Sequence, residues 1–103
     1  MNNMMNMQKM LKEAKKMQAK LEESQKELEK QTFEGHEPSG MIQVTVGGDR
    51  TLKAMTIKPE VVDPEDIDML VDLVITAVND GLSQVEKAQE QKMGNLTKGF
   101  PGF

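Results

Sequence analysis

The chain has 103 residues, no cysteine, one histidine and only three aromatic side chains, and its formal net charge is −4. A chain of this length forms one domain with a limited core, which oligomerisation commonly supplements. Disulfides, thiolate metal sites and cysteine nucleophiles are excluded, and one histidine argues against a zinc site. Because no apolar run approaches the roughly 18 residues that span a bilayer, and no secretory signal is visible, we expect a soluble cytoplasmic protein with no membrane partner.

Residues from about 4 to 31 are predicted to form one long helix. Good helix formers dominate this segment, and no glycine or proline precedes Gly35. Apolar or small side chains recur at alternating steps of three and four residues, as in a coiled-coil seam. The seam is apolar at its first positions and becomes partly polar at Ser24 and Gln31. Its members are Met7, Met10, Ala14, Met17, Leu21, Ser24, Leu28 and Gln31.

Short strands are predicted next. Residues 32–36 are a candidate edge strand, and the alternation in residues 41–46 predicts a strand with one apolar face. The Gly-Gly-Asp-Arg segment at 47–50 indicates a hairpin turn, because glycine reaches positive φ without steric cost. Residues 51–57 form the predicted return strand.

A second long helix follows Pro59. Asp63 is the predicted N-cap, with Pro64 at the first helical position. The helix is expected to run to about Met93 and to be capped by Gly94. One face carries an apolar stripe typical of a buried helix face, formed by Ile67, Leu70, Val71, Val74, Val78, Leu82 and Val85.

The predicted fold class is therefore α+β, a single domain over residues 1–103 with an α-β-β-β-α order, or α-β-β-α if the first strand is too short. Residues 1–6 and 95–103 are expected to be flexible. A helix of 28 residues is roughly 42 Å long, more than a small sheet and one other helix can cover. We therefore expect a homodimer, with an interface that includes Met7, Met10, Met17, Val74 and Val78.

Positive charge is concentrated at the start of the chain. Residues 1–20 contain five lysines and one glutamate, whereas residues 21–103 contain 8 basic and 16 acidic side chains. Lys9, Lys12, Lys16 and Lys20 lie within about 80° of one another on a helix, with Lys15 offset. Such a stripe can neutralise phosphates with little sequence preference, although it can also be a solvated helix face.

The kind of nucleic acid is narrowed by composition. Arg50 is the only arginine, so direct readout of guanine has one candidate. With no Tyr or Trp and three Phe, aromatic platforms for single strands are not expected, and double-stranded DNA is the predicted partner. The principal rival is a protein–protein adaptor that uses an exposed coiled-coil-like helix. Binding to an anionic membrane surface ranks third, because the helix lacks Trp, Phe and Leu anchors.

No arrangement of residues predicts an enzyme. The chain offers no combination of nucleophile, base and orienting group, and Gly47-Gly48 is too short for a phosphate-binding loop. The acidic group at 63–68 is explained by helix capping. We therefore expect no catalysis, no cofactor, no metal and no small-molecule substrate.

The order of these segments resembles the YbaB/EbfC family of nucleoid-associated proteins over residues 4 to 103. The most specific segments are VTVGG at 44–48 with its return strand, DPED at 63–66, and AVND at 77–80 followed by KMGNLT at 92–97. The resemblance implies a tweezer-like homodimer in the cytoplasm that binds DNA, alters its conformation and coats the nucleoid, with effects on gene expression. DNA contact on protruding helices would map onto Lys9, Lys12, Lys15, Lys16 and Lys20, and further onto Lys87, Lys92 and Lys98.

Overall fold

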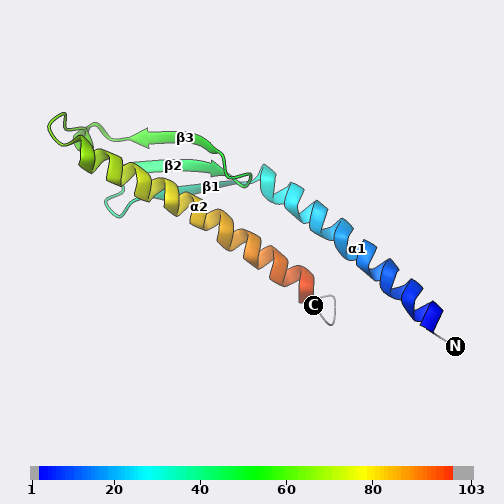
Figure 1. The fold of residues 1–103 in the computed structure, drawn as a ribbon. Helices are drawn as coiled ribbons and strands as arrows, with labels where there is room; N and C mark the ends of the chain where they lie inside the picture. Colours follow the sequence, from blue (N-terminus) through cyan, green and yellow to red (C-terminus); the bar gives the residue numbers. More distant parts are fainter. Residues whose placement is uncertain (1–2, 99–103) are drawn as a thin grey trace.

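The structure, a computed structural model, describes residues 3–98. They form α1 (Asn3–Lys30), β1 (Thr32–His36), β2 (Ile42–Gly47), β3 (Leu52–Ile57), a short 3-10 turn at Pro59–Val61, and α2 (Ile67–Lys98), as Figure 1 shows. The predicted α-β-β-β-α order is confirmed, and the first strand is long enough to pair along its whole length.

The three strands form an antiparallel sheet in the order β1-β2-β3. At the bulge between β2 and β3, Val46 pairs with Leu52 rather than with Lys53. The other pairs on this face are Val44 with Met55 and Ile42 with Ile57. Because directly paired residues point to the same side of a sheet, the apolar residues of both strands face α2.

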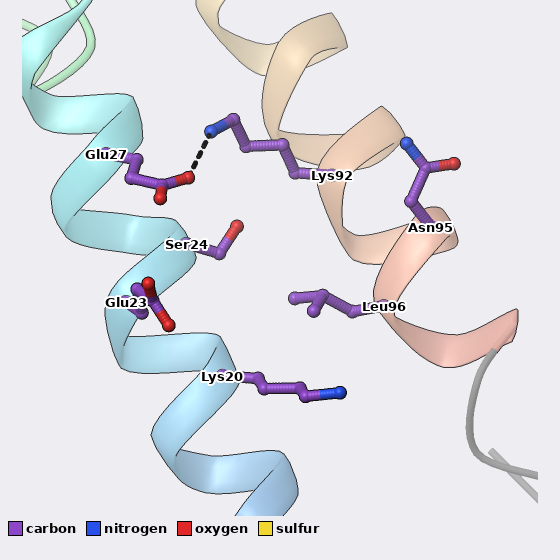
Figure 2. Close-up of a pocket in the computed structure, with 7 residues that line it drawn as sticks. All are labelled: Lys20, Glu23, Ser24, Glu27, Lys92, Asn95 and Leu96. Carbon is purple, nitrogen blue, oxygen red and sulfur yellow. Dashed lines mark ion pairs between the residues drawn. The ribbon is translucent and has the colours of Figure 1, made fainter.

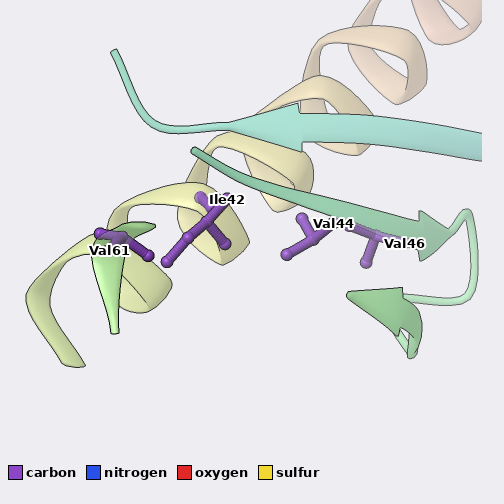
Figure 3. Close-up of a cluster of buried hydrophobic side chains, with 5 residues drawn as sticks. Ile42, Val44, Val46 and Val61 are labelled. Carbon is purple, nitrogen blue, oxygen red and sulfur yellow. The ribbon is translucent and has the colours of Figure 1, made fainter. Parts of the chain in front are cut away.

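The core lies between this face of the sheet and α2. Ile42, Val44 and Val46 are fully buried and pack with Val61 and with Ala77 of α2. Figure 3 shows the three β2 side chains on one side of the strand, with Val61 next to Ile42. The main contacts of α2 are with β1 and β2, so the helix lies over one side of the sheet and leaves the β3 side less covered.

The molecule is long and thin, with extents of 77 × 20 × 16 Å. The C-terminal half of α1 packs beside α2, where Leu28 is fully buried. The N-terminal half of α1 continues past the last turn of α2, as Figure 1 shows. The prediction that the domain cannot cover its own first helix is thus confirmed for that half.

The start of α2 differs from the prediction. Asp66, not Asp63, is the N-cap, since its Oδ1 accepts a hydrogen bond from the N–H of Met69 at 3.2 Å. Asp63 instead begins a β-turn with Pro64 as its second residue. The N–H of Asp66 donates a hydrogen bond to the Asp63 carbonyl across this turn at 3.0 Å. Asp at the first and Pro at the second position also favour a type I turn, so the same residue types suit two structures.

The end of α2 differs as well. The helix does not stop at Met93 but continues through Gly94 to Lys98. A glycine inside a helix costs only about 1 kcal/mol, and the additional turn places Leu96 toward α1. Residues 3–6 and 95–98, which were expected to be flexible, are helical, and the rest of both predicted flexible ends lies outside the described residues.

The hairpin between β2 and β3 is confirmed, but its glycines serve another purpose than predicted. Arg50, with φ of 63°, is the turn residue in the left-handed region. Gly48 is needed because its backbone meets the end of α1, where its N–H donates to the Gln31 carbonyl at 2.9 Å. A Cβ on Gly48 would overlap the carbonyl oxygen of Leu28.

Glu37, in the turn after β1, is a buried carboxylate that the sequence did not predict. Its side chain is 1 % exposed and accepts four hydrogen bonds, from the hydroxyl and N–H of Ser39 and from the N–H groups of Met41 and Ile42, at 2.6 to 3.1 Å. The Ser39 hydroxyl, helped by these N–H groups and opposed by desolvation, lowers the pKa of Glu37 from 4.5 to about 2.

Candidate nucleic-acid interface

The clearest candidate is the projecting part of α1, residues 4–16, which we call the arm. Every residue of the arm is exposed. It contains four lysines and one glutamate, Glu13, for a formal net charge of +3. Helical geometry places Lys9, Lys12 and Lys16 on one face and Lys15 to its side. The arm therefore presents a positively charged rod that neither the sheet nor the described part of α2 covers.

Lys20 lies just beyond the arm, where α2 begins to flank α1. There the two helices enclose an open pocket of about 400 Å³, with Lys20 on one side and Lys92 on the other. Figure 2 shows the Lys20 side chain extending across toward α2. Lys20 thus faces the space between the helices, whereas the described part of α2 does not cover the arm lysines.

Lys92 is engaged within the protein. Its Nζ lies 3.5 Å from Oε2 of Glu27, and its side chain is 26 % exposed. Figure 2 shows this ion pair bridging α2 and α1, with Glu23 one turn nearer the N-terminus of α1. The structure therefore places Lys20 and Lys92 across one pocket from each other, and Lys92 forms an ion pair with Glu27.

Lys87 and Lys98 are exposed on another side of α2. At 100° per residue they lie about 120° to 140° around the helix from Lys92, which faces the pocket. The eight lysines predicted to contact DNA thus fall into three groups: the arm, the pocket and this outer face of α2. Arg50 belongs to none of them, because it sits in the hairpin and its Nη2 donates to Gln89 Oε1 at 2.5 Å.

The residues predicted to form a dimer interface are also divided. Met7 and Met10 are 62 % and 68 % exposed on the arm, whereas Met17 is buried in the single chain. Val74 and Val78 are half-buried and pack against the core. Met17 therefore offers little surface to a second copy.

Next to Val74 and Val78 the structure reveals an apolar face that the sequence analysis only partly identified. Val71 and Ile75 of α2 are about half exposed, and so is Leu52 of β3, with Ile57 somewhat less. These β3 side chains point to the α2 side of the sheet, on the part that α2 covers least. Apolar residues at 52, 54, 55 and 57 were the available signal, but they do not alternate, so periodicity could not place Leu52 and Ile57 on one face. The bulge after Leu52 brings them to the same side.

Comparison with known proteins decides the family. Residues 3–100 match the YbaB/EbfC DNA-binding family. The chain belongs to this family. It is 52 % identical over 98 residues to a nucleoid-associated protein of Lactococcus lactis subsp. lactis, covering 95 % of this chain and 99 % of that protein. It is also 48 % identical over 103 residues to a nucleoid-associated protein of Enterococcus faecalis, covering 100 % and 99 %.

The fold of this YbaB/EbfC member also matches a solved structure. An uncharacterized protein from Helicobacter pylori superposes with a TM-score of 0.67 at 19 % identity, over 81 % of this chain and 87 % of the other. At that identity the match supports the shared fold alone. The family resemblance inferred from the sequence motifs is confirmed by the family match over residues 3–100 and by the nucleoid-associated relatives at about 50 % identity.

A metal site and a membrane-spanning helix each have structural requirements, which the described residues do not meet. Within residues 3–98, no three acidic or histidine side chains are grouped so as to hold a metal ion. Over the same residues, neither long helix has a segment apolar enough to cross a membrane.

Proposed function

We propose that this member of the YbaB/EbfC DNA-binding family works as a homodimer that binds duplex DNA through the lysines of its arms. The observation that carries the proposal is the fully exposed arm with Lys9, Lys12, Lys15 and Lys16 on it. Lysine contacts to phosphate release counterions and give affinity without direct base readout. The arm is thus suited to bind duplex DNA of varied sequence.

The homodimer is proposed on the apolar face formed by α2 and β3. Val71, Ile75 and Leu52 expose large apolar areas in a chain whose core is small. A second copy placed over this face would bury them and complete the cover of β3. The two arms would then stay uncovered and contact a duplex at separate points, which can bend or constrain it. We propose the nucleoid, in the cytoplasm, as the place of action, with effects on nucleoid organisation and gene expression.

A salt series on random-sequence duplex tests the DNA proposal. Four arm lysines in each of two subunits allow a slope of log affinity against log salt of at most roughly −7. Replacing Lys12 and Lys16 with Gln removes up to four contacts per dimer, so the slope should flatten by as much as about 3.6. The control is the double replacement of Lys26 and Lys30, which changes the charge of the same helix equally but lies outside the arm. Equal effects of the two variants would contradict the proposal.

A second candidate function is a protein–protein adaptor. It is favoured by the exposed apolar side chains on the arm, of which Met7, Met10 and Leu11 are 59 % to 68 % exposed. A helix with such a stripe can dock into a groove on a partner. Loss of duplex binding at physiological salt, together with a wild-type response of the lysine variants, would favour the adaptor over the DNA binder.

A further inference from the structure

The helix face that carries the arm lysines and Lys20 continues along α1, but the charged side chains that follow Lys20 on it are negative. Continuing at steps of three and four residues, the same face of α1 next carries Glu23 and Glu27. Both carboxylates line the pocket between the helices, together with Lys20 and Lys92 (Figure 2). A duplex that extended from the arm toward the sheet would therefore reach the open pocket beside α2 and meet two negative charges at it.

Glu27 also has a second effect, because it holds Lys92. The 3.5 Å ion pair directs the Lys92 ammonium toward α1. Because the Glu27 side chain is 61 % exposed and that of Lys92 is 26 % exposed, solvent reaches the pair and weakens it. A DNA phosphate can therefore displace Glu27 from Lys92. The released carboxylate would then lie beside that phosphate and repel it. Both the paired and the released states thus disfavour DNA at this position.

We propose that Glu23 and Glu27 set the boundary of the DNA-contact surface, confining the duplex to the arm by occupying Lys92 and by repelling phosphate. The inference rests on the proposed function and adds two acidic residues that limit it. The two long helices together carry more lysines than the arm alone, so a boundary of this kind decides how many of them reach the duplex.

The experiment compares two double variants of the full-length protein in the salt series on random duplex. Glu23→Gln with Glu27→Gln removes the boundary charges. The matched control, Glu22→Gln with Glu29→Gln, removes the same charge from exposed positions on the opposite side of α1. Circular dichroism of both variants checks that α1 remains helical.

With the boundary removed, the slope should become steeper by up to about 1.8 per dimer if each subunit recruits Lys92. Affinity at 0.1 M salt should rise by up to roughly eightfold for each recruited lysine. Adding Lys92→Gln to the boundary variant should abolish this gain, and the control variant should show no steepening.

Three results would overturn the inference. An equal gain in the control would mean that net charge alone matters, and no gain in either variant would mean that the boundary does not act. A gain that survives Lys92→Gln would show that Lys92 is not the recruited residue. If the wild-type protein fails to bind duplex at low salt, both the proposed function and this inference fail. If wild-type binding depends on Lys12 and Lys16, the proposed function stands even when one of the three results above overturns the inference.

Discussion

Gly35 of β1 and Gly81 of α2 bring a strand and a helix into direct backbone contact. A Cβ added to Gly35 would overlap the backbone nitrogen of Gly81 and the carbonyl oxygen of Ala77, and one added to Gly81 would overlap a methyl group of Val46. The first clash is with backbone, which cannot rotate away. This contact sets how closely α2 approaches the sheet, and therefore where the helix carries Lys92.

Replacing either glycine with alanine should destabilise the protein. Overpacking a close contact costs typically about 1 to 3 kcal/mol, and we expect Gly35→Ala to reach at least that range because both overlapping groups are backbone atoms. The control is Gly94→Ala in the same helix, where no atom lies within 4 Å of the added Cβ. It should stabilise by about 0.5 to 1 kcal/mol. Urea denaturation at one fixed protein concentration measures both, and a neutral Gly35→Ala would contradict the close contact.

The proposed dimer face predicts the effect of Ile75→Asp. Sedimentation of the wild-type protein should report about twice the 11.5 kDa mass of the chain. Because Ile75 is half exposed in the single chain, the subunit should tolerate Asp, but an unpaired charge buried in the interface costs several kcal/mol and should yield monomers. Thr76→Asp, on the exposed side of α2, should remain dimeric. A dimer that survives Ile75→Asp and dissociates with Met10→Asp would place the interface on the arm instead.

Glu37 predicts a specific pH dependence of stability. Its pKa is lowered in the folded state to about 2 from 4.5, so its stabilising effect is present in full above the unfolded value and is lost as pH falls from about 4.5 toward 2. Glu37→Gln should therefore lower the free energy of unfolding by a constant amount at neutral pH, and the gap to wild type should shrink over that acidic window. Urea midpoints between pH 2 and 7 test this, with Glu60→Gln as an exposed control. If the difference in free energy of unfolding between wild type and Glu37→Gln does not change with pH, the charge of Glu37 is not the source of the stabilisation.

The start of α2 offers a test at single-residue level. Asp66→Ala removes the side chain that caps Met69 and should cost about 1 kcal/mol, within the range of roughly 0.5 to 2 kcal/mol for N-cap losses. Asp66→Asn keeps an acceptor oxygen and should retain most of the stability. Thermal unfolding of the three proteins makes the comparison. Equal loss in the Ala and Asn variants would mean that the cap is not the source of the effect.

Features set by local pattern were predictable from the sequence. The length of α1 follows from its run of helix formers, the apolar face of β2 from its alternation, and the lysine face from helical spacing. Each depends on residues within a few positions of one another, so no knowledge of distant contacts was needed. The motifs that identify the family are likewise short segments in a fixed order.

What the tertiary structure decided involves partners far apart in the chain. Glu27 and Lys92 meet only because α2 folds back beside α1, and Met17 is buried while Met10 is exposed although both belong to one seam. Burial and ion pairing depend on where the helices lie relative to each other and to the sheet, and backbone contacts such as Gly35 with Gly81 define that placement.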